Sequence, residues 1–316
     1  MKNVVGIDIS KQLLDVDWLN KPITFDNSKE GINQLIAKLS KLNSLSLVIC
    51  EASGGYEQKL VHACHISNLP IHVAHANKIR HFAKSKGLLA KTDKLDARVL
   101  TEYGKLMNIS KDTLHLSENM LKIKQLLKSR EQLQGDRKRE KCLSDKIDTP
   151  AIVDSIDKHV KWLSESIKEI DEQLSELKKD DSIEQSYKLL TFIPGVGVMS
   201  AYYLISNLPE LGKISNKAIA ALVGVVPFNR DSGCYNGKRY IHGGRRKLRE
   251  TLYMAALTAT QFNNELKTFY QRLITEKKPA KVAIVAVLRK LLSMINSVMR
   301  RKSVWKENHE ISTNIC

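Results

Sequence analysis

Four carboxylates in the first hundred residues have the types and the spacing of metal ligands. Asp8 lies in a short apolar run, and Glu51 directly follows a second apolar run that ends at Cys50. Asp93 and Asp96 are three residues apart in a segment with helical texture, a spacing that puts both on one helix face. Each acid alone is also typical of a helix cap or a surface charge. Together they predict a site for one or two Mg²⁺ ions that supports phosphodiester displacement.

Strands and helices that alternate along the first domain would bring these acids together. Three β-branched and apolar runs within residues 3–25 predict a meander of strands, and Ser28 is positioned to cap the helix that follows. A buried strand over 45–50, a helix over 56–67 and a strand over 70–74 complete the pattern. This order predicts a ribonuclease-H-like α/β domain over residues 1–115, with a mixed sheet covered by helices on both faces. Glu51 then lies at the carboxyl end of its strand, close to Asp8 if the two strands are neighbours.

The residue composition and the spacing of apolar residues change twice after this domain. Residues 116–181 contain no strand-like run, and apolar residues between Ile152 and Leu177 recur at near-heptad spacing, which predicts a helical coiled-coil linker. We interpret this stretch as a structural spacer or a dimerisation arm. Residues 182–302 are basic and helix-rich, with Gly and Pro punctuation, and predict a second, all-α functional domain before a tail over 303–316.

Composition favours a nucleic acid as the partner. Lys and Arg total 51 against 34 Asp and Glu, which gives a net charge of +17 that a polyanion would neutralise. The amino terminus lacks the long apolar core of a signal peptide, and Arg289 and Lys290 interrupt the apolar stretch over 282–298. We therefore expect a cytoplasmic protein, nucleoid-associated in a bacterium, with no membrane partner. The five cysteines form no CxxC pair and are expected to be reduced thiols.

A second set of candidate residues lies in the basic domain. Residues 191–197 fit a helix-hairpin-helix turn in which Gly195 and Gly197 let backbone N–H groups approach a phosphate, although packed helices often share such a turn. Ser232, between Asp231 and Gly233, is by spacing a turn residue. Its neighbourhood is strongly cationic, and these side chains could clamp a scissile phosphate: Arg230, Lys238, Arg239, Arg245, Arg246 and Arg249. No nearby residue is an obvious general base, and His242 is interpreted as structural or phosphate-contacting.

The segment from Lys277 to Lys302 carries eight basic residues and no acidic one, with apolar residues at helical spacing. Such a charge run is usually a solvated face, but a long helix without acids favours phosphate contact, with Arg300 and Arg301 as the named candidates.

Three stretches around the acids resemble the signature of the insertion-sequence one-ten transposases and the related Piv-type DNA invertases. They are 6–11, 51–56 and 90–97. The intervening residues 77–84, with Arg80 and Lys84, resemble the basic lead-in of that family to its second Asp pair. The block from Ala221 to Arg246 resembles the carboxyl-terminal transposase domain of the family, which keeps a serine in a Ser-Gly pair.

This resemblance implies a RuvC-like nuclease domain in which Asp8, Glu51, Asp93 and Asp96 bind Mg²⁺, and a nucleophilic Ser232. It implies strand exchange of double-stranded DNA through a phosphoserine intermediate, at a composite site formed in an assembled complex. It also implies guidance by a structured RNA of the element. Because two duplexes must be exchanged, we expect a homo-oligomer, a dimer or a tetramer.

Three other functions remain open from the residues. A Piv-like invertase would invert a segment instead of inserting an element. A RuvC-like junction nuclease would hydrolyse DNA with activated water and would not need Ser232. A non-catalytic nucleic-acid-binding protein would carry the acids as surface charges and would be indifferent to magnesium.

Overall fold

The computed structural model divides the chain into two units, Met1–His115 and Leu116–Cys316. Each unit has its own hydrophobic core. The described residues are 3–42, 45–88, 93–107, 109, 117–228, 231–232, 235–236 and 240–306, with backbone alone at 93–95, 182, 231–232 and 235–236.

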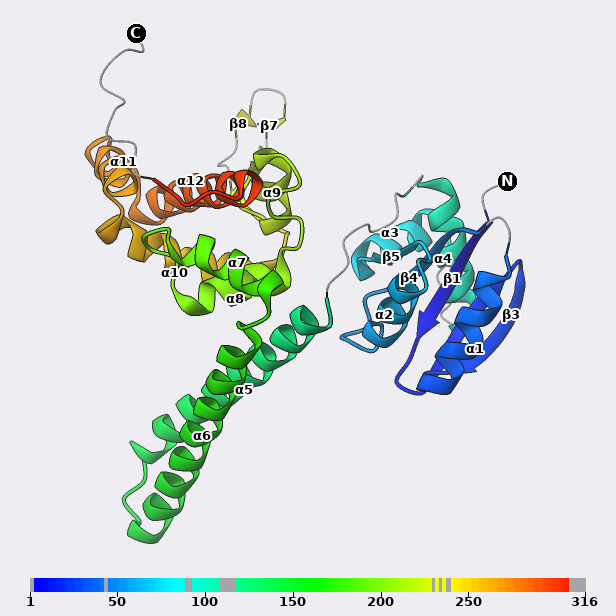
Figure 1. The fold of residues 1–316 in the computed structure, drawn as a ribbon, viewed down its shortest axis with the longest axis horizontal. Helices are drawn as coiled ribbons and strands as arrows, with labels where there is room; N and C mark the ends of the chain where they lie inside the picture. The colour runs from blue at the N-terminus through cyan, green and yellow to red at the C-terminus, as the bar shows by residue number, and fades with distance from the viewer. Residues whose placement is uncertain are drawn as a thin grey trace. The chain divides into compact units, whose positions relative to one another are not determined.

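The first unit is built on a five-stranded mixed sheet (Figure 1). Its strands are β1 (Asn3–Ile9), β2 (Leu13–Trp18), β3 (Lys21–Asp26), β4 (Leu45–Glu51) and β5 (Ile71–Ala74). The spatial order is β3-β2-β1-β4-β5, in which β1, β2 and β3 are antiparallel neighbours while β4 is parallel to both β1 and β5. The meander and the two later strands therefore pair in the arrangement of a ribonuclease-H-like sheet.

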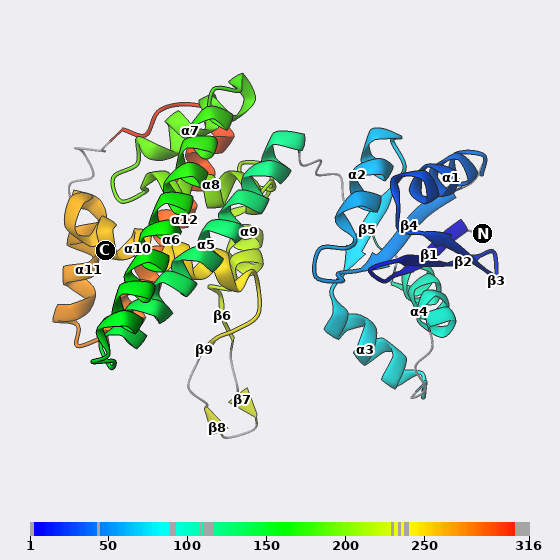
Figure 2. The same cartoon turned by 90° about the horizontal axis from the view of Figure 1, so that it is seen from below.

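Helices cover both faces of this sheet (Figure 2). On one face α1 (Lys29–Ser40) and α2 (Gln58–Ile66) pack on alternate residues of β1, namely Val5, Ile7 and Ile9. On the other face lie α3 (Ala76–Ser85) and α4 (Asp93–Leu106). The predicted cap is confirmed, because the Ser28 hydroxyl accepts a hydrogen bond of 3.1 Å from the Gly31 N–H at the start of α1.

Helix α4 lies directly on β1 because two glycines remove the side chains that would hold it away. A Cβ on Gly6 would overlap the Ala97 carbonyl and Thr101, and a Cβ on Gly104 would come within 2.7 Å of Val4. The Gly6 N–H donates a hydrogen bond of 2.9 Å to the Thr101 hydroxyl, which in turn donates to the Ala97 carbonyl. Strand β1 and helix α4 are thus locked together by backbone contact.

We predict that Gly6→Ala destabilises the first unit by about 1–3 kcal/mol, the usual range for overpacking a filled interior. The measurement is the free energy of unfolding from urea denaturation followed by circular dichroism. A matched control is Gly135→Ala in the middle of a helix of the second unit, where an added Cβ meets nothing within 4 Å. That change should raise stability by about 0.5–1 kcal/mol. Equal effects of the two substitutions would contradict the packing argument.

The second unit begins with two long antiparallel helices, α5 (Glu118–Ser144) and α6 (Pro150–Leu177). The predicted apolar seam of α6 is buried at Ile156, Leu163, Ile167, Ile170 and Leu174. Figure 1 shows this helical hairpin extending away from the rest of its unit. An ion pair between Arg130 and Asp171 joins the two helices at 2.6 Å, and the Tyr202 hydroxyl donates to the Leu174 carbonyl at 3.0 Å.

The rest of the unit is a bundle of shorter helices around one long central helix. The bundle comprises α7 (Asp181–Thr191), α8 (Val198–Asn207), α9 (Asn216–Val223), α10 (Arg246–Phe262), α11 (Asn264–Thr275) and α12 (Ala280–Arg301). Nine residues of α12 are buried, and seven of them belong to the common core of the unit. Among the described residues α12 is the one helix long and apolar enough to cross a membrane. Half of its most apolar stretch is buried inside the bundle. We therefore interpret its apolar character as that of a core helix.

Candidate active site

Asp8 and Glu51 lie on adjacent strands at the same edge of the sheet. Strands β1 and β4 are parallel, and their register pairs Ile7 with Cys50, so Asp8 and Glu51 are the next residues on each strand. Strand alternation puts both acids on the face that also carries Gly6, the face covered by α4. Both acids are half-buried. Two segments more than forty residues apart in sequence therefore bring carboxylates to one place.

The packing of α4 directs its first turn to the same edge. Gly104 contacts Val4, and Ala97 with Thr101 contacts Gly6, so the helix runs antiparallel to β1. Continuing one turn further brings residues 93–96 over the end of β1 that holds Asp8. Asp96 is half-buried, and the backbone of α4 begins at Asp93, whose side chain lies outside the described residues.

The donor set of this edge fits a hard divalent cation. Carboxylate oxygens on a rigid sheet are the ligands that Mg²⁺ prefers. Among the described side chains, which do not include that of Asp93, no group of three or more His, Cys, Asp or Glu is close enough to hold a metal ion. Three of the four predicted acids, Asp8, Glu51 and Asp96, thus share one edge of one face, while a complete set of ligands remains a prediction.

Two further acids on β2 share this face, and the sequence reasoning missed them. Asp15 pairs directly with Asp8 across the antiparallel ladder and accepts a hydrogen bond of 2.8 Å from the Thr24 hydroxyl. Asp17 pairs with Gly6, is 5% exposed, and its Oδ2 has no hydrogen-bond partner among the described residues. The signal was the alternation of Asp with apolar residues over 13–18, which is typical of a solvated strand face until α4 is known to cover it.

Ser232 belongs to a β-hairpin arm that interrupts the helices of the second unit. The base of the arm pairs β6 (Pro227–Phe228) with β9 (Tyr240–Ile241), and its outer part pairs β7 (Asp231–Ser232) with β8 (Tyr235–Asn236). Figures 1 and 2 show β7 and β8 away from the helical body. At the base, the His242 ring stacks on Phe228 at 4.3 Å and lies 5.5 Å from the Tyr240 ring.

Five of the six cations predicted to surround Ser232 fall into two groups. Arg230, Lys238 and Arg239 lie outside the described residues. Arg245 donates to Glu210 at 2.6 Å and to the Asn207 carbonyl at 2.9 Å, while Arg249 donates to three backbone carbonyls between α9 and α10. The structure therefore ties these two guanidinium groups to the fold, and their role as phosphate contacts remains a prediction.

The amino terminus of α10 is a positively charged surface. Arg246 is exposed and donates a hydrogen bond of 2.9 Å to Glu250. That hydrogen bond, together with the charges of Arg246, Lys247 and Arg249, lowers the pKa of the Glu250 carboxyl below its usual value. An exposed carboxyl whose pKa falls in this way indicates a local excess of positive charge.

The remaining candidates lie on separate helices. Arg80 and Lys84 are exposed on α3 of the first unit. Gly195, at φ 102°, packs its Cα face on Ala259 of α10, and Gly197 caps α8 after the predicted hairpin turn. Arg300 donates to the Ile214 carbonyl, and Arg301 ends α12 exposed to solvent.

Comparisons with known proteins show similarity to two families and several relatives. The DEDD model of IS110 elements, described as transposase, matches residues 5–147, and the transposase IS116/IS110/IS902 family matches residues 187–271. The pilin gene-inverting proteins of Moraxella bovis and Moraxella lacunata are each 30% identical to the chain, and each alignment covers 98% of it and 99% of the relative. A 42 kDa protein of insertion element IS900 from Mycobacterium paratuberculosis is 28% identical over 40% of the chain and 34% of the relative.

Proposed function

We propose that this chain, which belongs to the IS116/IS110/IS902 family of transposases, exchanges DNA strands with a Mg²⁺-binding acidic cluster in its first unit and a serine nucleophile in its second. The observation that carries the proposal is the placement of Asp8 and Glu51 side by side on β1 and β4, beneath the first turn of α4. One transposase model also matches residues 5–147, which include nearly all of the first unit, and a second matches residues 187–271 of the second unit. The chain is thus a DNA recombinase of a mobile element.

Asp8, Glu51, Asp93 and Asp96 would hold the metal in this proposal. Bound Mg²⁺ would stabilise the negative charge that develops on the reacting phosphate. The rigid contact between β1 and α4 through Gly6 supports the proposal, because it keeps the carboxylates of strand and helix in a fixed relation. Asp17 supplies a further carboxyl group on the same face, paired with Gly6 across the ladder.

Ser232 would act on the phosphodiester directly. Its Oγ forms a bond to phosphorus while the bond from phosphorus to the sugar oxygen of the leaving strand breaks. The serine proton passes to solvent, and the leaving oxygen takes up a proton to become a hydroxyl. The energy of the broken bond is kept in the phosphoserine ester, so a hydroxyl of a new strand can later displace the serine. No external energy source is needed for this rejoining.

The partners of the proposed reaction are polyanions. The resemblance to this family implies double-stranded DNA and a structured guide RNA, and a net charge of +17 would favour the binding of either. The turn between α7 and α8 would bring backbone N–H groups to a phosphate, and the cationic groups at the start of α10 would contact the strand near Ser232. A dimer or a tetramer would supply the several active sites that strand exchange needs.

Inversion is the second candidate outcome of the same chemistry. The relatives that align over the whole chain are pilin gene-inverting proteins, and this favours inversion of a DNA segment by the present chain as well. Insertion of an element and inversion of a segment both break and rejoin strands. They differ in how the ends are joined.

A cleavage and joining assay tests the proposal. The substrate is a supercoiled plasmid that carries the genomic segment around the gene, and the products are sequenced after incubation with Mg²⁺ or with excess EDTA. We expect rejoined DNA with Mg²⁺ and unchanged plasmid with EDTA. Inverted junctions would identify an invertase, and new insertion junctions a transposase. Free ends that are never rejoined, or equal activity in EDTA, would contradict the proposal.

A further inference from the structure

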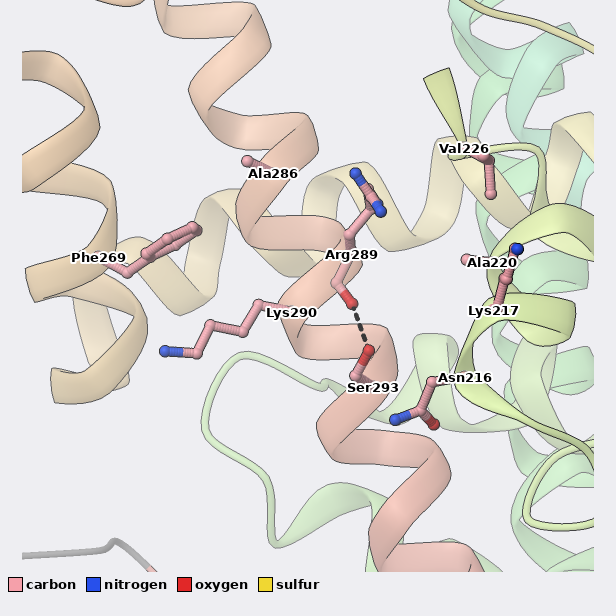
Figure 3. Close-up of a pocket in the computed structure, with 9 residues that line it drawn as sticks. All are labelled: Asn216, Lys217, Ala220, Val226, Phe269, Ala286, Arg289, Lys290 and Ser293. Carbon is pink, nitrogen blue, oxygen red and sulfur yellow. Dashed lines mark hydrogen bonds between the residues drawn. The ribbon is translucent and has the colours of Figure 1, made fainter. Parts of the chain in front are cut away.

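The helical unit contains an open cavity of about 560 Å³ between α9, α11 and α12 (Figure 3). This volume falls within the range of about 300–1,000 Å³ in which proteins bind small organic groups. Lys217 and Asn216 line it from α9, Arg289 and Ser293 from α12, and Phe269 from α11. Val226, the residue directly before β6, lines the cavity next to the base of the hairpin arm.

Two cations of this cavity are available to a ligand. Lys217 and Arg289 are exposed, and neither forms an ion pair with any described residue. Figure 3 shows Lys217 on α9 and Arg289 on α12, across the cavity from one another. Lys290 instead points away from them, is bound to Glu265 at 2.9 Å and lies over the Phe269 ring at 5.0 Å. The lining therefore offers an anion two cations that form no ion pair with a described residue.

A buried amide orients a further donor at this site. Asn296 is fully buried, and its Nδ2 donates to the Asn216 Oδ1 at 2.7 Å and to the Ile214 carbonyl at 3.0 Å. Its own Oδ1 accepts from the Gly212 N–H at 2.7 Å. Since the Asn216 oxygen is used in this network, the Asn216 nitrogen is the group left to donate into the cavity. A polar core residue thus fixes a hydrogen-bond donor at the rim.

The remaining lining of the cavity is apolar. It is contributed by Ala220, Val226, Ala286 and the half-buried Phe269, which are distributed around it (Figure 3). A site that combines two cations, a fixed donor and apolar carbon matches a nucleotide, whose phosphate is anionic and whose sugar and base are largely apolar on their faces. A base stacked in a duplex cannot enter such a recess, whereas an unstacked one can.

We propose that this cavity holds one unstacked nucleotide of the nucleic acid on which the protein acts, with its phosphate on Lys217 and Arg289. The inference rests on the proposed function for the identity of the polymer, and it assigns to α9 and α12 a role separate from the chemistry of Asp8 and Ser232. It places a single-stranded nucleotide beside the base of the arm that carries the serine.

Equilibrium binding to two DNA probes tests the inference in full-length protein without Mg²⁺. The probes are a single strand of ten thymidylates and a blunt duplex of ten base pairs, both followed by fluorescence anisotropy. Ala286→Phe fills the cavity without a change of charge, and we expect about a tenfold loss of affinity for the single strand with little change for the duplex. Val282→Phe is the matched control, because Val282 is exposed one turn earlier on α12 and does not line the cavity.

Charge is tested on the same helix. Arg289→Gln should lower the slope of log affinity against log salt by about 0.7 for the single strand, the value for one lost phosphate contact. Lys281→Gln, an exposed cation on α12 outside the cavity, should change the slope less. Thymidine monophosphate should compete only weakly. The concentration that displaces half of the bound strand should be at least a hundredfold higher for the monophosphate than for the unlabelled single strand.

Three results would overturn the inference. They are wild-type affinity of Ala286→Phe for the single strand, identical effects of Arg289→Gln and Lys281→Gln, and binding of thymidine monophosphate as tight as that of the strand. Because these assays measure binding without metal, their failure leaves the recombination assay unaffected. A failed recombination assay with intact pocket binding would reject the proposed function alone.

Discussion

Ser232→Ala is expected to abolish a covalent protein–DNA adduct while DNA binding stays intact. The substrate is a suicide duplex whose nick releases the leaving strand and prevents religation. Wild-type protein should give an SDS-resistant adduct that requires Mg²⁺, and the variant should give none. Strand exchange should fall by about four orders of magnitude or more, as expected when a nucleophile is removed. The lost hydroxyl changes volume and charge very little, so a folding defect would be a weak explanation.

A control within the same arm separates chemistry from local structure. Asn236→Ala changes β8, which pairs with the strand of Ser232, and it should leave the adduct in place. Peptide mapping of the wild-type adduct identifies the attached residue. Attachment elsewhere, or an equally abundant adduct from Ser232→Ala, would reject the serine as nucleophile.

The acidic cluster should produce the second large effect. Asp8→Asn, Glu51→Gln, Asp93→Asn and Asp96→Asn each remove a negative ligand without removing volume. We expect each to lower strand exchange by about 100- to 1,000-fold, the range for losing one charge-stabilising group. DNA affinity should not fall, because removing negative charge from a basic protein does not weaken its attraction for phosphate.

Two exposed acids of the first unit serve as controls for the cluster. Asp26→Asn on β3 and Glu30→Gln on α1 match the chemistry of the substitutions and lie on the outer surface. Both should retain strand exchange. Near wild-type strand exchange by two or more of the cluster variants would contradict the proposal that these acids bind the metal.

The first unit could be predicted closely because its elements follow from local patterns. The apolar run over 45–50 indicated a buried strand, and the structure places it beside β1 with Glu51 as its last residue. The covering of the acid face was not predictable. It depends on a contact between Gly6 and Thr101, which are 95 residues apart. The periodic pattern of apolar residues along the sequence does not indicate such a distant contact.

The second unit shows where sequence patterns stop being informative. The near-heptad seam of α6 is visible in the sequence because one residue type repeats at a fixed interval. The hairpin arm has strands of two residues each, too short for any alternation to be detected. The basic stretch over 277–302 was interpreted by its charge, whereas the apolar stripe of α12 makes it the central helix of the bundle.

The charges of the candidate site carried a similar ambiguity. A guanidinium in a basic stretch can contact phosphate or hold the fold together, and the sequence does not distinguish the two. Arg245 contacts Glu210, which lies 35 residues away, so its partner could not be inferred from neighbours along the chain. Arg289 has no ion-pair partner among the described residues, although it was read in the sequence as an interruption of an apolar stretch.

The two long helices give the α5–α6 hairpin a fixed length. A helix of 28 residues such as α6 spans about 42 Å, which is slightly more than one turn of duplex DNA at about 34–36 Å. Because the buried seam repeats nearly every seven residues, removing one repeat from each helix would shorten the hairpin by about 10 Å and keep the same residues facing inward. The reach of the hairpin tip from the helical bundle can therefore change in steps of one repeat without a change in the packing of the seam.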